Sequence, residues 1–132
     1  MGETMLHHLE LYVSDLEASA GFWGWLLGEL GYEPYQRWEQ GRSWKKDRFY
    51  LVLVQVEEKH RDPAYHRRKV GMNHVAFHAS SREQVDRLAT ELAARGTVML
   101  YGDRYPYGGG EGHYALFCED PDRIKVEVAA PN

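Results

Sequence analysis

The chain has 132 residues and a formal net charge of −4 at pH 7, from 16 basic and 20 acidic side chains. This length fits one domain of ordinary size with its own core and excludes two full domains. The acidic balance argues against a nucleic-acid partner, since such partners are bound mainly through their phosphates. An apolar fraction of 43% suits a folded core and excludes a disordered chain.

We expect neither a membrane segment nor a secretory signal in this sequence. The uncharged stretch from Ala18 to Gly28 has eleven residues, far fewer than the roughly 20 that cross a bilayer. The first residues lack the basic region and apolar stretch of a signal peptide, so we expect a cytoplasmic protein without a membrane partner. Cys118 is the only cysteine, which excludes an intrachain disulfide and a cysteine-rich zinc site. Histidine and carboxylate side chains would have to bind any metal.

The two halves of the chain repeat one another at an offset of 66 residues. The segment from His8 to Ser14 reads HLELYVS and aligns with HVAFHAS from His74 to Ser80. Alternating apolar residues predict a β-strand in each segment. The Ser-x-x-Glu motifs at residues 14–17 and 80–83 predict a capping box that begins a helix in each half.

Each half continues with a helix and three short strands. Apolar side chains at helical spacing predict one helix that ends at Gly31 and another that ends at Gly96. β-prone runs follow at residues 35–38, 43–44, 49–56, 97–101, 114–119 and 124–129. The predicted fold is therefore α+β, with two βαβββ modules paired about a pseudo-twofold axis and their sheets forming a shared cleft.

We expect these modules to form a single domain over residues 1–132. Module one covers about residues 4–57, a loop linker covers 58–70, and module two covers about 71–130. The modules belong to one domain because a unit of this size with one helix could bury little surface by itself.

Strand periodicity divides the side chains between two faces, because alternate residues of a strand point to opposite sides. The apolar face meets the helix of its module and contains Leu9, Leu11, Val13, Val75, Phe77, Ala79, Ile124, Val126 and Val128. The opposite, polar face then contains His8, Glu10, Tyr12, His74, His78, Lys125 and Glu127.

Three residues of the polar face have the chemistry of a metal site. His8 and His74 recur at the same phase of equivalent strands, and Glu127 lies on the last strand. Two imidazoles and one carboxylate suit a divalent Fe, Mn, Ni or Zn ion with open positions for water or substrate. The alternative is that these histidines are ordinary surface or hydrogen-bonded residues and that no metal is bound.

Further residues are candidates for catalysis or ligand binding. Glu10, Tyr12 and His78 are candidate acid or base groups, and His78 is favoured because its ordinary pKa suits proton transfer near neutral pH. A flat or conjugated ligand would find contact area on the aromatic side chains and a charge partner on a lysine. These candidate ligand-binding residues are Trp44, Tyr50, Tyr101, Tyr105, Tyr107 and Lys125. The alternative is that they line a wet pocket, or belong to the core or a dimer interface.

The motifs at both module starts and at the C-terminus resemble the vicinal oxygen chelate superfamily. His8 to Ser19, followed by Phe22-Trp23, is similar to its opening, Asn73 to Phe77 to its second-module start, and Phe117 to Glu127 to its closing stretch. The superfamily includes glyoxalases, extradiol dioxygenases, fosfomycin-modifying enzymes and bleomycin-binding resistance proteins. The resemblance covers nearly the whole chain and implies the paired βαβββ fold.

The resemblance also implies a ligand set. His8, His74 and Glu127 match the superfamily's metal-ligand positions, and a fourth position lies on the last strand of the first module. An ungapped alignment of residues 47–53 with 122–128 places Val52 opposite Glu127, and valine cannot bind a metal. We therefore expect at most three protein ligands, which argues against glyoxalase I. Arg123 replaces the glycine of the usual Asp-Pro-Asp-Gly turn and must adopt its backbone geometry.

Three functions fit this sequence. The first is a metal-dependent lyase or dioxygenase whose ion chelates two oxygens of a small-molecule substrate. The second is a metal-free protein of the bleomycin-resistance kind, which confers antibiotic resistance by sequestering an aromatic natural product. The third is a subunit or regulatory module with a vestigial cleft. The resemblance also implies a homodimer.

Overall fold

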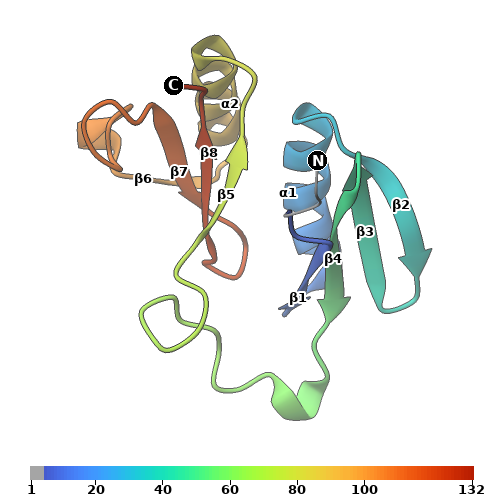
Figure 1. Cartoon of the computed structure of the whole chain (residues 1–132). Helices are drawn as coiled ribbons and strands as arrows, with labels where there is room; N and C mark the ends of the chain where they lie inside the picture. The colour runs from blue at the N-terminus through green and yellow to red at the C-terminus, as the bar shows by residue number, and fades with distance from the viewer. Residues whose placement is uncertain (1–4) are drawn as a thin grey trace. The chain divides into compact units, whose positions relative to one another are not determined.

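The computed structural model describes residues 5–132 and divides into two compact units, Met1–Ala64 and Tyr65–Asn132. The boundary between the units falls inside the predicted linker of residues 58–70. The predicted start of module one, at residue 4, lies outside the described residues. Each unit has its own sheet and its own helix (Figure 1).

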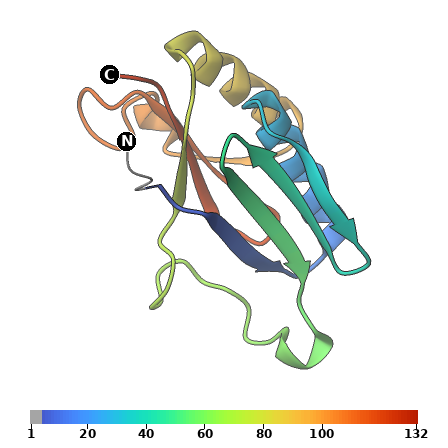
Figure 2. The ribbon, with the colours of Figure 1, turned by 45° about the vertical axis from the view of Figure 1, so that its right-hand side comes forward.

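The first unit is a four-stranded sheet with a helix against one face. Its elements are β1 (His8–Val13), α1 (Leu16–Glu29), β2 (Glu33–Trp38), β3 (Gly41–Lys46), β4 (Phe49–Gln55) and the short 3-10 helix η1 (Glu58–His60). The strand order is β1-β4-β3-β2, with β1 parallel to β4 and the other pairs antiparallel. Helix α1 packs against β2, β3 and β4 (Figure 2).

The second unit repeats this plan. Its elements are β5 (Val75–His78), α2 (Arg82–Ala94), β6 (Val98–Leu100), the 3-10 helix η2 (Gly102–Arg104), β7 (Ala115–Glu119) and β8 (Lys125–Ala129). The order β5-β8-β7-β6, with β5 parallel to β8, matches the first sheet strand for strand. The predicted α+β fold with two βαβββ modules is confirmed.

The core of each unit lies between its helix and the sheet. The buried residues of the first unit include Val13, Trp23, Leu27, Leu51 and Leu53. Those of the second unit include Phe77, Leu88, Leu116, Val126 and Val128. Side chains predicted for the helix face, such as Phe77 and Val126, are thus buried there, and the polar set lies on the opposite, open face of each sheet.

The strand pairs β1–β4 and β5–β8 also have equivalent registers. Glu10 of β1 lies opposite Val52 of β4, and Ala76 of β5 lies opposite Glu127 of β8. Glu10 and Ala76 are equivalent in the 66-residue repeat. Val52 is therefore the structural equivalent of Glu127, as the ungapped alignment predicts.

Both helices begin one residue later than the predicted capping boxes. Asp15 caps α1 and Ser81 caps α2, and each side chain accepts a hydrogen bond from a backbone N–H of the first turn. The prediction of Ser14 and Ser80 as caps is wrong. In each half, two neighbouring side chains could cap the helix, and the backbone geometry determines that the second of the two does so.

The other predicted boundaries differ from the structure by few residues. Gly31 and Gly96 follow the helix ends with φ of +96° and +88°, the left-handed geometry expected of a glycine after a helix. β3 is longer than the predicted residues 43–44, because its charged ends pair with β4 in spite of their low β propensity. Arg123 has φ +67° and so adopts the turn geometry that glycine usually provides. Within residues 5–132, no helix is long and apolar enough to cross a bilayer.

Candidate functional site

The open face of the second sheet contains a buried carboxylate. Glu127 of β8 lies opposite Ala76 of β5 and Phe117 of β7. Strand alternation points its side chain away from α2, whereas Val126 and Val128 are buried beneath the helix. The Glu127 side chain is only 7% exposed, and a buried carboxylate needs hydrogen-bond partners to offset its lost hydration.

Two histidines supply these partners. His74 Nε2 lies 3.1 Å from Glu127 Oε1, and His113 Nε2 is in hydrogen-bond contact with Oε2. Each carboxylate oxygen therefore meets one imidazole. The two imidazoles are 34% and 43% exposed, so solvent reaches the rim of the cluster while the carboxylate stays covered.

The second ring nitrogen of His74 is also engaged. Nδ1 lies 2.6 Å from Asn73 Oδ1, and an oxygen acceptor at that place makes Nδ1 the donor. In a neutral ring, Nε2 then directs a lone pair at the Glu127 carboxylate. Two acceptors share such a contact only with a cation between them, either a proton or a metal ion. With the Asn73 amide in this orientation, a metal ion in place of the proton would bind His74 through Nε2.

His113 is the site residue that sequence reasoning missed. It ends the loop of residues 102–113, which follows no strand or helix period, so its direction could not be deduced. The available signal is the glycine run at residues 108–110 just before it. At Gly109 a Cβ would lie 3.0 Å from both His113 Cδ2 and Phe117 Cζ. The glycine thus allows the loop backbone to pack closely over the histidine and the sheet.

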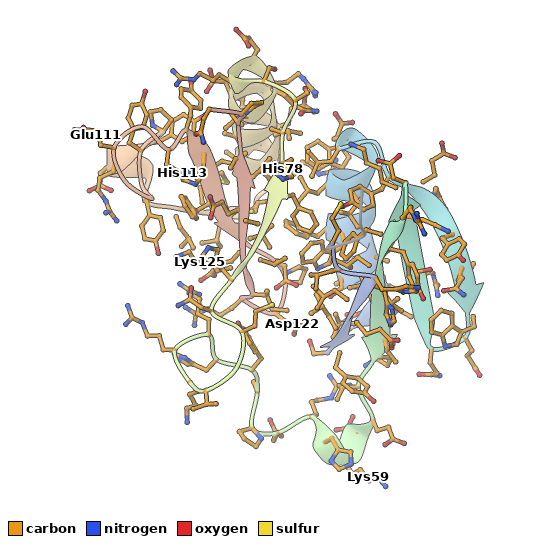
Figure 3. The ribbon with its side chains drawn as sticks, viewed as in Figure 1. Lys59, His78, Glu111, His113, Asp122 and Lys125 are labelled. Atoms are coloured by element: carbon orange, nitrogen blue, oxygen red, sulfur yellow. The ribbon has the colours of Figure 1, made fainter. Side chains whose placement is uncertain are left out.

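Beside this cluster, Lys125 and Tyr101 form a pair on the same face. Lys125 Nζ donates a hydrogen bond of 2.8 Å to Tyr101 Oη, and Nζ also lies 5.2 Å from the centre of the Phe117 ring. This hydrogen bond lowers the pKa of Tyr101 below its ordinary value, and the charges of Lys125, Arg67 and Arg104 act in the same direction, against a smaller opposite effect of burial. Figure 3 shows His113 and Lys125 among the side chains of the second unit, with His78 on β5.

The two other tyrosines predicted to bind a ligand belong to a cluster at α2. The hydroxyls of Tyr105 and Tyr114 both donate to the carboxylate of Asp86 on α2, and the rings of Tyr107 and Tyr114 are 5.8 Å apart. Burial and then Asp86 raise the pKa of Tyr105 far above its ordinary value. These contacts fasten the loop of residues 102–113 to the helix, and the Tyr105 hydroxyl is already engaged.

The open face of the first unit presents the predicted alternation. His8, Glu10 and Tyr12 are exposed, whereas Leu9 and Leu11 are half-buried. The His8 ring stacks on Tyr50 with centroids 4.8 Å apart and planes 5° from parallel. His8 Nε2 lies 3.7 Å from Glu10 Oε1. A histidine, a carboxylate and an aromatic ring therefore share this face.

Trp44 lies in the core of the first unit. It pairs with Leu51 on the helix side of the sheet, is 7% exposed and contacts α1 beside Gly24. The predicted strand of residues 43–44 was too short to define which face this side chain occupies. Trp44 is thus a packing residue and has no part in the function proposed below.

No alternative carboxylate or amide of β4 replaces Val52 on the open face. Val52 itself is 3% exposed. The side chain of Gln55 forms hydrogen bonds with the backbone. Its Oε1 accepts from Leu16 N at 2.8 Å and its Nε2 donates to Ser14 O at 2.9 Å. The register of β4 is continuous from Phe49 to Val54, so no shift turns Gln55 toward the face of Val52.

The donor set around Glu127 fits a divalent metal in its chemistry. In the part of the chain from residue 5 onward, no three histidine, cysteine or acidic side chains are grouped as a metal ion requires. Instead, His74 and His113 each contact the Glu127 carboxylate directly. Imidazole nitrogens and a carboxylate oxygen are the atoms that Fe, Mn, Ni and Zn prefer, and His74 Nε2 lies 3.1 Å from this carboxylate. To bind a metal, these side chains would have to exchange their contacts with one another for contacts with the ion.

Comparison with known proteins agrees with this fold. The sequence model of the Glyoxalase/Bleomycin resistance protein/Dioxygenase superfamily matches residues 5–128. The chain belongs to this superfamily. Its members typically bind small-molecule ligands, usually bind a divalent metal and often form dimers.

Individual superfamily relatives cover almost the whole chain. The uncharacterized protein YqjT of Bacillus subtilis is 64% identical over 127 residues, which are 96% of this chain and 99% of the relative. A crystal structure of a "putative glyoxalase" from Bacillus halodurans is 56% identical, with a TM-score of 0.96 over 98% of this chain and 97% of the other. Lactoylglutathione lyase from Agrobacterium tumefaciens shares the fold, with 23% identity and a TM-score of 0.68 over 98% of this chain and 96% of the other.

Proposed function

We propose that this protein is a metal-dependent enzyme that acts on a small molecule through two neighbouring substrate oxygens. The observation that supports this proposal is the Glu127 carboxylate, 7% exposed and flanked by imidazoles on both oxygens. His74 through Nε2 and Glu127 through Oε1 are the proposed ligands from the second unit. His8, predicted from the repeat, is the proposed third ligand.

His113 has a separate role in this proposal. Its contact with Oε2 fixes the orientation of the carboxylate and leaves Oε1 for the metal, just as Asn73 fixes the His74 ring. Partners of this kind usually contribute 10–100-fold to metal affinity, in order of magnitude. His113 is therefore a positioning residue for Glu127.

When bound, a divalent ion at these ligands would polarise the chelated oxygens and stabilise negative charge on them. The chain's own groups would then move protons. His78, Tyr12 and Glu10 are the candidate acids and bases, as the sequence predicts. His78 is exposed at the end of β5, and Tyr12 and Glu10 are exposed on β1. Phe117, buried in the sheet beside Glu127, would exclude water from one side of the site.

Glyoxalase I activity is not part of this proposal. Val52 occupies the position equivalent to Glu127 and offers no donor atom, so the proposed ligand set lacks the fourth ligand of that position. A dioxygenase or a lyase with open coordination positions is compatible with three protein ligands.

Metal content tests the proposal. We expect about one ion per chain after purification or after addition of Fe(II), Mn(II), Ni(II) or Zn(II), measured by elemental analysis. His74→Ala, Glu127→Gln and His8→Ala should each abolish stoichiometric binding. His60→Ala in η1 is the matched control and should bind as the natural chain does. Absence of stoichiometric metal under all these conditions would exclude the enzyme.

The second candidate function is metal-free sequestration of an aromatic natural product. The observation that favours it is the aromatic surface of the open faces, with Tyr50 stacked on His8 and Tyr101 edge-on to Phe117 at 5.2 Å. Tight binding of an intact planar compound in the presence of a chelator, measured by calorimetry, would support this function. Failure to bind any member of a panel of planar natural products would remove it.

A further inference from the structure

Positive charge without a carboxylate partner lies next to Glu127 in the second unit. Lys125 is two residues before Glu127 in β8, on the same face, and is half-buried. Among the residues that the structure describes, neither Lys125 nor Arg104 forms an ion pair. Glu119, the residue across from Lys125 on β7, is instead bound by Arg67 at 2.7 Å and approached by Arg123 at 3.5 Å.

Tyr101 provides a hydrogen-bond donor at the same place. Its oxygen accepts from Lys125 Nζ at 2.8 Å, so its own hydroxyl hydrogen remains able to donate to a further acceptor. Arg104 lies over the Tyr101 ring, with Cζ 4.8 Å from the ring centre. Two cationic groups and one phenol thus converge without an anion to neutralise them.

The phenol is held in this position by its backbone and by a glycine. Tyr101 has φ +58° and ψ +34°, the left-handed region that a bulky residue rarely adopts. At Gly108, a Cβ would come within 2.8 Å of Tyr101 Cβ, so the loop backbone packs directly against this side chain. Backbone strain maintained by close packing is typical of functional sites.

We propose that Lys125 and Tyr101 bind an anionic group, a carboxylate or a phosphate, of the small molecule that occupies this face. The inference rests on the proposed function in one respect, since it identifies the substrate class of the same site. Lys125 Nζ lies 5.2 Å from the Phe117 ring and the His74 ring lies 6.3 Å from it. Both His74 and Lys125 therefore lie close to the same ring, and one small molecule on this face could contact both.

The surroundings strengthen such an interaction. Phe117 is 5% exposed and provides an apolar wall beside Lys125 Nζ, and a charge pair in a partly desolvated place is stronger than one in open water. The lowered pKa of Tyr101 reflects first its hydrogen bond from Lys125 and then the same positive charges. Glu127 is the nearest acidic group on β8, and its carboxylate is already engaged by His74 and His113.

Titration of anions into the metal-free full chain tests the inference. Inorganic phosphate and acetate are added separately after chelator treatment, and amide shifts are followed by 1H-15N NMR. We expect saturable shifts at Tyr101, Phe117 and Lys125 for at least one anion. Lys125→Met and Tyr101→Phe should each weaken this binding at least tenfold. Lys59→Met in η1 is the matched control and should leave it unchanged. A preference for phosphate or acetate identifies the substrate group.

Two results would overturn the inference. The first is the absence of saturable shifts for both anions. The second is a set of shifts that persists in Lys125→Met and centres on the neighbouring cavity of about 110 Å³, lined by Tyr65, His66, Arg67, Arg68 and Arg123. If Lys125→Met proves to be unfolded, as loss of its dispersed NMR spectrum would show, anion binding by Tyr101→Phe decides between the two outcomes. Because anion binding is measured without metal and metal content without anion, failure of this inference is distinguishable from failure of the proposed function.

Discussion

Glu127 illustrates how burial and hydrogen bonding single out a candidate carboxylate for the proposed site. Its place on the open face follows from the alternation of β8, and its partner His74 follows from the repeat, so both could be predicted from the sequence. His113 could not be predicted, because a loop has no period that fixes the direction of its side chains. The same limit applies to Tyr105, whose loop turns its hydroxyl to Asp86.

Removal of the His113 imidazole tests its positioning role. We expect His113→Gln to weaken metal binding by roughly 10–100-fold while saturating metal still gives one ion per chain. The physical reason is that Oε2 of Glu127 loses its partner while the proposed ligands stay in place. A competition titration against a chelator gives the affinity, with His60→Gln as control. Unchanged affinity, or complete loss of the ion as for His74→Ala, would contradict this role.

The pH response of Cys118 is a second prediction at this scale. Burial first, and then Asp120 and Glu119, raise the pKa of its thiol from 9 to about 12. Near pH 8 the folded chain should therefore react with iodoacetamide roughly 1000-fold more slowly than the urea-unfolded chain, because the thiolate is the reactive form. Equal labelling rates would contradict the prediction.

The raised pKa of Cys118 also makes the stability of the folded chain depend on pH in a definite direction. The raised pKa means that the unfolded chain loses the thiol proton first as pH increases. The contribution of this group to stability is thus fully present below pH 9 and is lost progressively as pH rises toward about 12. Urea unfolding at several alkaline pH values would measure the decline, with Cys118→Ala as the control that lacks it.

At the scale of the elements, strand phase decides which predictions succeed. Phe77 and Val126 lie in strands long enough for the alternation to be read, and both are buried as predicted. Trp44 fell in a predicted strand of only two residues, where no face could be assigned. The pairing of β3 with β4 places it on the helix side, and this pairing depends on contacts distant in sequence.

Two glycines of α1 provide a matched test of that packing. A Cβ at Gly21 meets nothing within 4 Å, whereas a Cβ at Gly24 lies 3.2 Å from Trp44 Cζ2. Gly21→Ala should raise the free energy of unfolding by about 0.5–1 kcal/mol, since alanine favours the helix. Gly24→Ala should raise the free energy of unfolding by less, or lower it, because the Trp44 indole has to shift. Urea denaturation measures both, and equal gains would show that Trp44 does not pack there.

At the scale of the whole molecule, the two repeated modules have the same strand pairing but different side chains at equivalent positions. The repeat of 66 residues and the equivalent strand pairs make Val52 and Glu127 counterparts. The fold, the buried faces and this correspondence could be predicted because they depend on period and repetition. The residues that complete the site from loops depend on tertiary packing and could not.

Restoring a carboxylate at the valine tests the correspondence. Val52 is 3% exposed, so Val52→Glu should lower the free energy of unfolding of the metal-free chain by about 2–4 kcal/mol. It should also raise metal affinity at least tenfold, because a fourth ligand becomes available. Val52→Gln is the matched control for size and polarity. Unchanged metal affinity in Val52→Glu would contradict the functional equivalence of the two positions.

The attachment of residues 102–113 to Asp86 has a consequence for how distant changes act on the site. Asp86 anchors Tyr114, the residue that directly follows His113, so the outer surface of α2 is mechanically linked to the Glu127 carboxylate. A modification or a bound protein that displaced Asp86 would move Tyr105 and Tyr114, and with them the loop that carries His113. Natural variation on this side of α2 would then change the position of His113 without altering any residue of the proposed site.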